Sequence, residues 1–399
     1  MKILIVTSMT DLFPLITHLL EELERRGTRT EVFYINDLGP TGLAAIKPTG
    51  LAELGMTGFA AKVAFRVPAL RYYAMLTLLK RRLALLPVNF DAVNIHYADP
   101  IYRHLARTLK RHGKKLITTI WGSDFLRAGP SDLQDLGYTL DASDIVTLAN
   151  PEVLRSLIAR YPGVSDRARV VRFGMKSLDV ITGLQQSESR EETRKKLGFP
   201  SGKVVVACGY NGKPAQRHTM IADAFAKLPP DVKSRLFALF PMRYNNDLTY
   251  RDEVKKSLES TRVEYRILEG EISFEDNCRI RVASDYVVNI QTTDMLSHSL
   301  QEHMFAGSSM IVGNWLPYGD FEEMGIPLQK VGSVEEISAA LEKAALEGIR
   351  GRPRPPYADR LYDYSSWSSN IGKWLELFDS KDVKGSSLSL VAAGRKIYE

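Results

Sequence analysis

Cysteine and long apolar runs are both scarce in this sequence. The two cysteines, Cys208 and Cys278, lie far apart and form no CxxC pair. They indicate neither a disulfide framework nor a zinc site, and a reducing cytoplasm is the simplest setting. No apolar stretch reaches the roughly 18 residues that cross a membrane. The opening MKILIVTSMT is too short for a secretion signal and fits a first strand, so we expect a cytoplasmic protein.

A strong charge of one sign is also absent, since 53 Lys and Arg residues stand against 47 Asp and Glu residues. The net charge of +6 is nevertheless uneven along the chain. Residues 1–180 carry 24 basic and 17 acidic side chains, and the remainder carries 29 and 30. A basic first half favours an anionic partner there, such as membrane lipid, a phosphorylated acceptor or nucleic acid. A cationic surface that serves only solubility is the alternative.

Strands and helices alternate along the first half. Strands are predicted for the β-rich runs KILIVT, TEVFYIND, FDAVNIHY, KKLITTIWG, SDIVTLA and RARVVRFG. Helical periodicity lies between them, in residues 12–26, IYRHLARTLKRHG and PEVLRSLIARY. This alternation predicts a parallel sheet covered by helices, with a ligand crevice at the carboxyl ends of the strands.

The same alternation restarts after a polar stretch, residues 185–196, and the short helix SREETRKKLG. Strands are predicted for KVVVAC, SRLFALFPM, VEYRILEG, DYVVNIQ and SSMIVGN, and helices for HTMIADAFAKLP, YRDEVKKSLES, FEDNCRIRVAS and SLQEHMFAG. We therefore expect an α/β protein of the GT-B architecture, with two Rossmann-like doubly wound domains facing a central cleft. The predicted domains are residues 1–185 and 186–365, and residues 366–399 supply a return helix, in YSSWSSNIGKWLELF, and a tail.

Two carboxylates eight positions apart stand out in QTTDMLSHSLQEHMFAGSSMIVGN, namely Asp294 and Glu302. Asp294 follows a predicted strand, and Glu302 is expected to open the next helix. Both are therefore expected at carboxyl strand ends, where charged acceptors can hold sugar hydroxyls. Capping of the helix N-terminus is the structural alternative.

A glycine-containing loop with two cations joins a strand to a helix in residues 208–218, CGYNGKPAQRH. Gly209 and Gly212 let the backbone approach a ligand closely. The helix N-terminus, with Lys213 or Arg217, offers a diphosphate site. A plain surface loop with solvated cations is the alternative.

Further candidates follow strands of the first half. In WGSDFLR, Gly122 permits a tight turn, and Asp124 can accept a proton, hold a sugar hydroxyl or cap a helix. His96 and Asp99, in NIHYADP, end the preceding strand. These three titratable side chains are the candidate catalytic groups of the first half, with a structural role as the alternative for each.

Residues 61–86 mix apolar and aromatic side chains with the cations Lys62, Arg66, Arg71, Lys80, Arg81 and Arg82. A basic amphipathic segment of this kind can lie on anionic lipid. It predicts a protein that is peripheral at the inner face of the membrane. A core-packed helix with a solvated cationic face is the alternative.

The second half resembles the retaining GT-B glycosyltransferases of family 4. Those proteins carry E-x7-E, then a helix of small residues and an apolar strand, and here the corresponding run is Asp294-x7-Glu302 with EHMFAGSSMIV. The resemblance implies that Glu302 binds the ribose of a nucleotide-diphosphate sugar and that Asp294 contacts the donor sugar. It also implies that the first domain takes the acceptor and that no metal or cofactor is needed. The donor-binding set is then Gly209, Asn211, Gly212, Lys213, Arg217, His298, Ser299 and Glu302, and the catalytic set is Asp294, Asp124, His96 and Asp99.

The sequence departs from that family at three positions. Asp294 replaces a Glu and is one methylene shorter. Tyr210 stands where the family has an Arg after the first glycine of the phosphate loop, so Lys213 and Arg217 must supply the charge. Trp121 stands where the family has the His of HGSD.

A second resemblance concerns the mechanism. GYNGKPAQRH, FPMRYNNDLTYRDEV and WLPYGDF are similar to segments of bacterial fucosaminyltransferases, which are inverting. Inversion needs a general base for the acceptor hydroxyl, and Asp99, Asp124 or His96 are the candidates, whereas retention does not need that base. We expect retention, with transfer to a lipid-linked or other glycan acceptor in bacterial surface polysaccharide synthesis, and inversion is the alternative.

Other functions remain compatible with the sequence. A nucleotide-sugar 2-epimerase shares the expected fold, and a sugar-binding protein without catalysis would tolerate Asp294. A nucleic-acid-binding protein would suit the basic half, but the aromatic residues are not interleaved with cations in a stacking pattern. We therefore expect no nucleic-acid partner.

Overall fold

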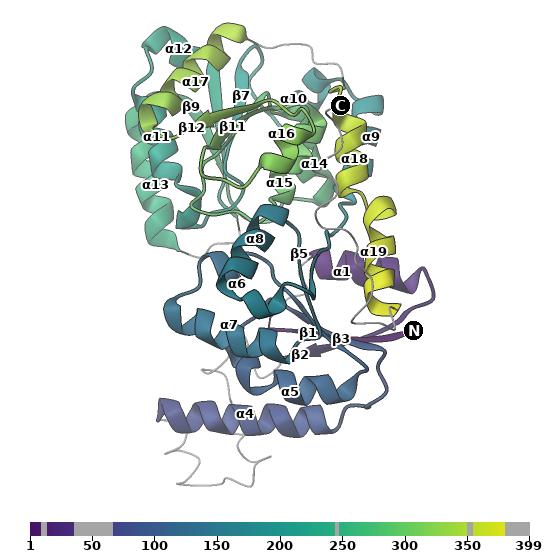
Figure 1. The fold of residues 1–399 in the computed structure, drawn as a ribbon. Coiled ribbons are helices and arrows are strands. Elements are labelled where there is room, and N and C mark those ends of the chain that lie inside the picture. The colour runs from purple at the N-terminus through teal and green to yellow at the C-terminus, as the bar shows by residue number, and fades with distance from the viewer. Residues whose placement is uncertain (9–13, 36–66, 244–246, 349–353, 380–399) are drawn as a thin grey trace, which may run out of the picture. The chain divides into compact units, whose positions relative to one another are not determined.

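The computed structural model describes residues 1–8, 14–35, 67–243, 247–348 and 354–379, which form two compact units (Figure 1). Unit 1 comprises Met1–Phe173 and Asn370–Glu399, and unit 2 comprises Gly174–Ser369. Both units are α/β, with one parallel sheet of six strands each.

Unit 1 has the strand order β2-β1-β3-β4-β5-β6. The strands are β1 (Lys2–Thr7), β2 (Arg29–Tyr34), β3 (Ala92–His96), β4 (Leu116–Thr119), β5 (Ile145–Leu148) and β6 (Ala168–Val170). The helical segments are α1 (Pro14–Glu24), α4 (Pro68–Ala84), η2 (Pro100–His104), α5 (Ala106–Leu109), η3 (Lys110–His112), α6 (Ser123–Leu126), α7 (Pro130–Ala142), α8 (Pro151–Arg160) and η4 (Pro162–Val164), and most of α19 (Trp367–Asp379). The strand order reverses between β1 and β3, so a ligand crevice is expected at their carboxyl ends.

Unit 2 has the strand order β12-β11-β10-β7-β8-β9. The strands are β7 (Val204–Cys208), β8 (Leu236–Pro241), β9 (Glu264–Leu268), β10 (Tyr286–Asn289), β11 (Ser309–Gly313) and β12 (Leu328–Val331). The helical segments are α9 (Ser177–Ser187), α10 (Arg190–Lys196), η5 (Pro214–Gln216), α11 (His218–Ala226), α12 (Pro230–Ser234), α13 (Leu248–Thr261), α14 (Phe274–Ala283), α15 (His298–Ala306), α16 (Gly319–Glu323), α17 (Val334–Glu347) and α18 (Ala358–Ser365). Here the order reverses between β7 and β10.

Both faces of the unit 2 sheet are buried, which is why its strands are continuous apolar runs. Val206 packs into a cluster with Ile221 and Phe225 of α11. The next residue, Ala207, packs into a different cluster with Met304 of α15. Successive side chains of a strand point to opposite faces, so helices on both sides are needed to bury them.

Two helices differ from the prediction. The segment IYRHLARTLKRHG divides into η2, α5 and η3 instead of forming one helix. Its first part, η2, packs against α7, and Arg103 pairs with Asp135 of α7 at 2.5 Å. The predicted terminal helix is interrupted at Ser366, which is extended and accepts a hydrogen bond from the Ser369 amide at 3.3 Å. Ser366 therefore ends α18 and caps the start of α19.

The unit boundary lies before α9, whereas the sequence placed it near residue 185. Leu178 and Ile181 of α9 are buried in the same cluster as Met304, so α9 belongs to unit 2 by its packing. The sequence pattern did not predict α9, which contains Gly183, a residue that is unfavourable inside a helix.

Candidate functional site

Three loops of unit 2 lie at one edge of its sheet. Strands β11, β10 and β7 are neighbours in that order, and all are parallel. The chain leaves their carboxyl ends at residues 314–318, 290–297 and 209–217. The order reverses between β10 and β7, the position where doubly wound sheets bind ligands. Both stretches that the sequence selected in this half therefore reach the same place.

Asp294 lies in the loop after β10 and is 8% exposed. Its Oδ2 accepts a hydrogen bond from the Ser297 amide at 3.1 Å and from the Tyr318 hydroxyl at 2.5 Å. The Tyr318 oxygen in turn accepts from Asn289 Nδ2 at 2.7 Å. The carboxylate is thus held between the start of α15 and the loop after β11.

Helix α15 begins at His298, one residue before the predicted helix SLQEHMFAG, so the separate expectation that Glu302 opens this helix is wrong. Ser297 is the N-cap, and its side chain accepts from the Leu300 amide at 3.3 Å. A Ser at this position satisfies a first-turn amide better than the later Glu could. His298 and Ser299 form the first turn and are half-buried.

Glu302 is the fifth residue of α15 and is 9% exposed. Its Oε2 accepts from Nε of Arg281 on α14 at 2.9 Å, and Arg281 is itself buried. No described residue bonds the other oxygen, Oε1. A buried carboxylate needs such a charged partner, and the pair fixes the direction of the carboxylate.

The loop after β7 is fastened to the loop after β10 through two glutamines. Gln216 Oε1 accepts from the Tyr210 amide at 3.1 Å, and Gln216 Nε2 donates to Gln291 Oε1 at 3.0 Å. The Tyr210 hydroxyl donates to the same Gln291 oxygen at 3.0 Å. Nothing in the local sequence marks either glutamine, because they are 75 residues apart.

Both predicted cations of this loop are accessible. The Arg217 guanidinium lies 4.8 Å from the ring centre of Trp315, which follows β11. Lys213 is exposed, and its amide donates to Asn211 Oδ1 at 3.0 Å. Within the described ranges neither cation forms an ion pair with a carboxylate. They remain able to neutralise an anionic ligand.

Gly209 is required by the loop for two reasons. Its φ is +69°, and an added Cβ would lie 2.9 Å from both Gln216 Oε1 and His218 Nε2. Each of those atoms belongs to a buried side chain.

Gly209→Ala is therefore expected to destabilise the protein by about 1–3 kcal/mol through backbone strain and the clash. Chemical denaturation measures the loss, and Gly270→Ala is the control. Gly270 also has positive φ, +76°, but no atom lies within 4 Å of an added Cβ. Equal losses in the two variants would contradict the close approach at Gly209.

In unit 1, His96 is fully buried among aromatic rings. Its ring centre lies 6.1 Å from Trp121, 5.8 Å from Phe173 and 5.9 Å from Trp374. Burial lowers the pKa of His96 to about 3, so the ring is neutral at pH 7. The side chain is part of an aromatic cluster formed by residues of unit 1.

Asp124 and Asp99 both lie at carboxyl strand ends of unit 1, but their surroundings differ. Asp124 is buried and accepts from the amides of Ala98, Trp121 and Gly122 at 2.8–3.0 Å. It thereby joins the loops after β3 and β4. Asp99 caps η2, accepts from the Ile101 amide at 3.1 Å and is only half-buried.

Burial is also the main influence on both carboxyl groups. It raises the pKa of Asp124, and the amide donors counteract that rise. It raises the pKa of Asp99 too, with a further contribution from the nearby charge of Asp132. A raised pKa moves a carboxylate toward the range of a general base.

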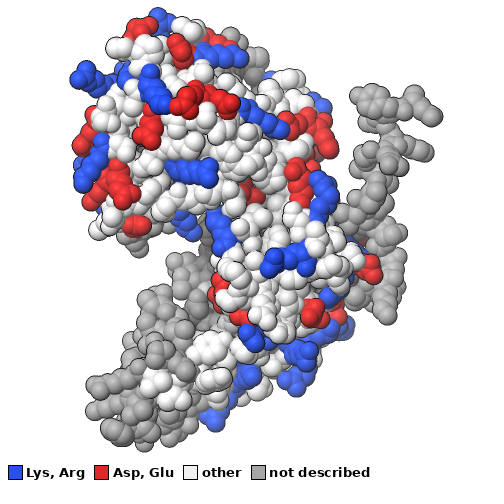
Figure 2. Space-filling model, turned by 60° about the vertical axis from the view of Figure 1, so that its left-hand side comes forward, with Lys and Arg blue, Asp and Glu red and all other residues white. Residues whose placement is uncertain are grey.

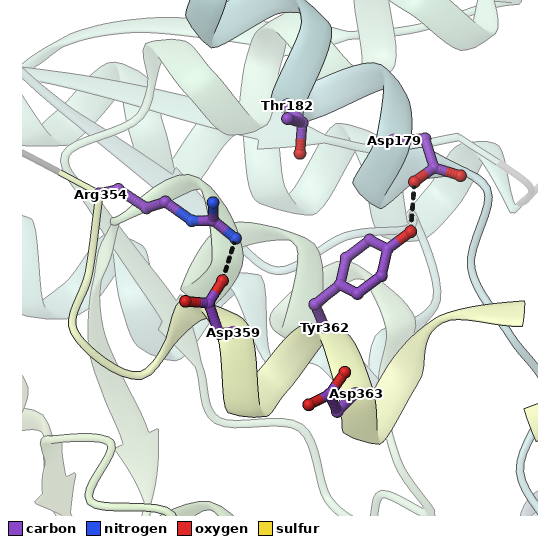
Figure 3. A pocket seen from close by; sticks show the side chains of 6 residues that line it. All are labelled: Asp179, Thr182, Arg354, Asp359, Tyr362 and Asp363. Carbon is purple, nitrogen blue, oxygen red and sulfur yellow. Dashed lines mark hydrogen bonds and ion pairs between the residues drawn. The ribbon is translucent and has the colours of Figure 1, made fainter. Parts of the chain in front are cut away.

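A surface groove of about 500 Å³ lies elsewhere on unit 2, between α9 and α18 (Figure 3). Tyr362 donates to Asp179 at 2.7 Å, and Arg354 pairs with Asp359 at 2.6 Å. The groove is lined by Asp179, Thr182, Arg354, Asp359, Tyr362 and Asp363. Its one lining cation is already paired, and three carboxylates would repel a diphosphate. It is therefore not the site that the two sequence motifs indicate.

Solved structures match this fold across nearly the whole chain. The N-terminal domain of trehalose-6-phosphate phosphatase from Candida albicans has a TM-score of 0.65 at 11% identity, covering 94% of this chain and 96% of that chain. Anabaena HepE, in complex with UDP and glucose, has a TM-score of 0.63 at 13% identity, covering 94% and 99%. A UDP-forming α,α-trehalose-phosphate synthase from Burkholderia xenovorans, in complex with glucose-6-phosphate, has a TM-score of 0.64 at 10% identity, covering 96% and 100%.

The fold is GT-B. No protein-family model matches the sequence, and no curated protein matches it. At such low identity the likeness concerns the fold, and substrate and reaction must be argued from the site.

One surface of this GT-B chain combines cations with exposed apolar residues. On α4 and just after it, Tyr73 is 65% exposed, Leu85 85% and Val88 72%. Lys80 and Arg81 on the same helix are also exposed. Figure 2 shows Lys and Arg side chains gathered on the surface of unit 1. Part of the predicted amphipathic segment, residues 61–66, lies outside the described residues.

The described residues of the GT-B chain contain no cluster of three or more His, Cys, Asp or Glu side chains able to bind a metal ion. They also contain no helix with the length and apolar character needed to cross a membrane.

Proposed function

We propose that this chain is a glycosyltransferase that moves a sugar from a nucleotide-diphosphate sugar to an acceptor. The observation that carries the proposal is the carboxyl edge of unit 2, where the buried Asp294 and the loop with Lys213 and Arg217 lie at the strand-order reversal. Carboxylates suit sugar hydroxyls, and cations suit a diphosphate. Fold neighbours solved in complex with UDP, with UDP and glucose, and with UDP-2-fluoro glucose support this ligand class.

Each site residue has a distinct role in the proposal. Glu302, oriented by Arg281, accepts the ribose hydroxyls, and Asp294 accepts hydroxyls of the donor sugar. Lys213 and Arg217 stabilise the negative charge that develops on the leaving diphosphate. The amides at the start of α15, at His298 and Ser299, and the loop amide of Asn211 add partial positive charge. The Gly212 amide donates instead to the Arg243 carbonyl at 2.8 Å. These groups suffice for the electrostatic work without a metal or cofactor.

We propose a retaining reaction and keep inversion as the second candidate. Retention needs no base for the acceptor hydroxyl, and two of the three candidate bases suit that role poorly. The His96 ring is enclosed, and backbone amides engage both oxygens of Asp124. Asp99, whose pKa is raised by burial, favours the alternative. The anomeric configuration of the product, read by NMR, distinguishes the two reactions.

A thermal-shift screen of sugar nucleotides tests the proposed function most directly. A ligand that binds only the folded state raises the free energy of unfolding by about 2.7 kcal/mol at a concentration of 100 Kd. We expect at least one of the UDP-, dTDP-, GDP- and ADP-sugars to raise Tm in a concentration-dependent manner. If none does, the proposal fails. Release of the nucleoside diphosphate only when acceptor is added separates transfer from 2-epimerisation.

We further propose that the acceptor is lipid-linked, in bacterial surface polysaccharide synthesis, and that unit 1 meets an anionic membrane at the cytoplasmic face. The α4 surface supports this, because Tyr73 and Leu85 can enter the lipid interface while Lys80 and Arg81 meet the headgroups.

Vesicle binding tests the membrane contact. The protein is expected to sediment with vesicles of phosphatidylcholine and phosphatidylglycerol, less so as salt rises, and not with phosphatidylcholine alone. Each cation near such a surface contributes about 1 kcal/mol, so Lys80→Glu with Arg81→Glu should weaken binding at least about tenfold. Lys255→Glu with Lys256→Glu, two exposed cations on α13, is the matched control. Binding that is absent or insensitive to salt would count against the membrane contact.

A further inference from the structure

The loop after β11 places a tyrosine directly on Asp294. This tyrosine belongs to the segment WLPYGDF and to neither of the two donor-site motifs, residues 208–218 and 294–302. Tyr318, at 2% exposure, donates to Asp294 Oδ2 at 2.5 Å and accepts from Asn289 Nδ2 at 2.7 Å. The three side chains form one buried hydrogen-bonded chain. They come from the end of β10, the loop after β10 and the loop after β11.

The two hydrogen-bond partners of Tyr318, Asn289 and Asp294, set the direction of its hydroxyl proton. The Asn289 amide nitrogen can only donate, so the Tyr318 oxygen accepts there and its one proton points at Asp294. Burial raises the pKa of Tyr318 well above its usual value, which keeps the phenol protonated and able to donate. Asp294 therefore receives a short charge-assisted hydrogen bond, which is stronger than one between neutral groups.

The tyrosine itself has little freedom to move. Its ring lies 5.6 Å from Phe321 and belongs to the buried cluster that also contains Met304 and Phe305 of α15. The Asp294 carboxylate is thus anchored on one side to the start of α15, through Ser297, and on the other to this packed ring. A carboxylate that its neighbours already orient can accept sugar hydroxyls without a further loss of side-chain freedom.

We propose that Tyr318 is a positioning residue, which holds the Asp294 carboxylate in the orientation that receives the donor sugar. This inference rests on the proposed function. Its specific consequence is that Tyr318 acts on the sugar end of the donor, because its one proton goes to Asp294. The Gln291 side chain also interacts with the Tyr318 hydroxyl, but it is held independently by Tyr210 and Gln216.

Tyr318→Phe tests the proposal, since it removes the hydroxyl and keeps the ring. Calorimetric titration with UDP and with UDP-glucose is the readout, extended to the matching dTDP, GDP and ADP pairs. We expect affinity for the sugar nucleotide to fall about tenfold, which is the cost of one hydrogen bond to a charged group. Affinity for the nucleoside diphosphate alone should stay within about twofold of wild type.

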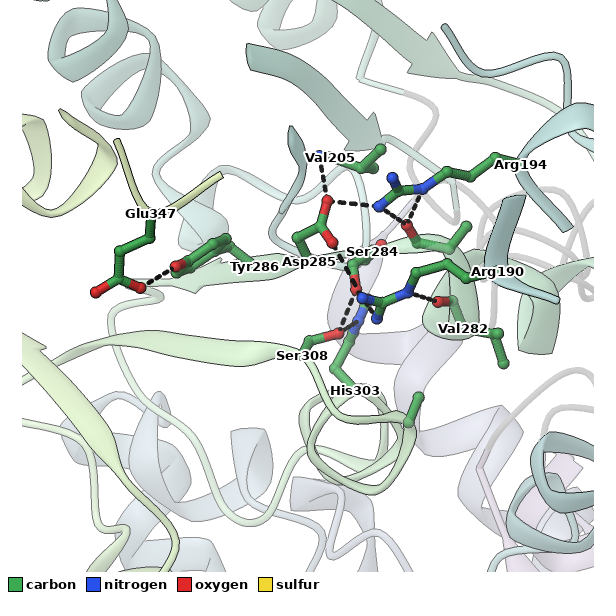
Figure 4. A network of polar contacts seen from close by, with 12 residues as sticks. Arg190, Arg194, Val205, Val282, Ser284, Asp285, Tyr286, His303, Ser308 and Glu347 are labelled. Carbon is green, nitrogen blue, oxygen red and sulfur yellow. Dashed lines mark hydrogen bonds and ion pairs between the residues drawn. The ribbon is translucent and has the colours of Figure 1, made fainter. Parts of the chain in front are cut away.

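A double-mutant cycle with Asp294→Ala then asks whether the tyrosine acts through the carboxylate. In that background Tyr318→Phe should cost nothing further, because the group it positions is gone. Tyr286→Phe is the matched control. The Tyr286 hydroxyl donates to Glu347 at 2.7 Å, also a buried tyrosine on a carboxylate, at the opposite end of β10 (Figure 4). Asn289→Ala, which leaves ring and hydroxyl in place, should act in the same direction with a smaller loss.

The outcomes separate this inference from the function beneath it. If wild type binds no sugar nucleotide, the proposed function fails and the inference with it. Three results with a wild type that binds would overturn the positioning role while the function stands. Tyr318→Phe could bind the sugar nucleotide as tightly as wild type, or lose as much affinity for the nucleoside diphosphate as for the sugar nucleotide. It could also lower affinity in the Asp294→Ala background as much as it does in wild type. If Tyr318→Phe does not fold, Asn289→Ala decides by the same comparison of sugar nucleotide with nucleotide.

Discussion

Replacing Lys213 and Arg217 together by alanine is expected to lower nucleoside-diphosphate release at least about a thousandfold. Each cation in the proposed site stabilises charge on the leaving diphosphate, and removal of one such group costs about a hundredfold to a thousandfold. The substrate is the sugar nucleotide selected by the thermal-shift screen, and the transfer rate is measured as release of the nucleoside diphosphate.

The same variant should keep its fold, because neither side chain carries a described ion pair. Lys213 is exposed, and Arg217 loses only its contact with the Trp315 ring, which contributes about 0.5–1 kcal/mol at an accessible site. Lys255→Ala with Lys256→Ala removes the same charge from exposed positions of α13 and is expected to be fully active. Full activity of the Lys213 and Arg217 variant, or equal losses in both double variants, would refute the phosphate role.

Asp285→Asn is expected to cost about 3–5 kcal/mol of stability, the largest single effect predicted for unit 2. The carboxylate is fully buried, with one oxygen on Arg190 at 3.0 Å and the other on Arg194 at 2.5 Å (Figure 4). It also accepts from the Val205 amide at 2.8 Å. Removal of one member of a buried ionic network leaves charges that are not compensated, and that penalty exceeds the value of the pair itself.

The loss should appear as a lowered melting temperature of unit 2. The network fastens α10 to the amino-terminal side of β10 and β7, next to the core of the unit. Scanning calorimetry is expected to show a transition that falls by roughly 10 °C. Glu335→Gln is the control, since Glu335 pairs with Lys227 on the exposed surface, where solvent screens the pair, and its loss should leave the melting temperature nearly unchanged. A loss at Asp285 as small as that of the control would contradict the account.

Much of the fold could be predicted because its signals are local. The β-branched run of β7 and the apolar run of β10 each specify a buried parallel strand without reference to the rest of the chain. The ends of the helices were harder to predict from the sequence. Ser297, an ordinary N-cap residue, starts α15 four residues before the position expected from Glu302, and Ser366 interrupts the predicted terminal helix.

The candidate site could be predicted only in outline. The positions of Asp294 and of the loop with Lys213 follow from their places after strands, since carboxyl ends of parallel strands meet at one edge. The environment of His96 could not be predicted, because the ring that stacks on it, Trp374, is far away in the sequence.

The sequence by itself determined the two α/β units, their parallel strands and the chemical types gathered at the edge of unit 2. These depend on residue periodicity and on turn residues, which act over a few positions. Only the tertiary structure decided which partners the acidic groups have, Tyr318 on Asp294 and Arg281 on Glu302. Those partners are 24 and 21 residues away along the chain, and the packing of α14, α15 and the loop after β11 brings them within hydrogen-bond distance.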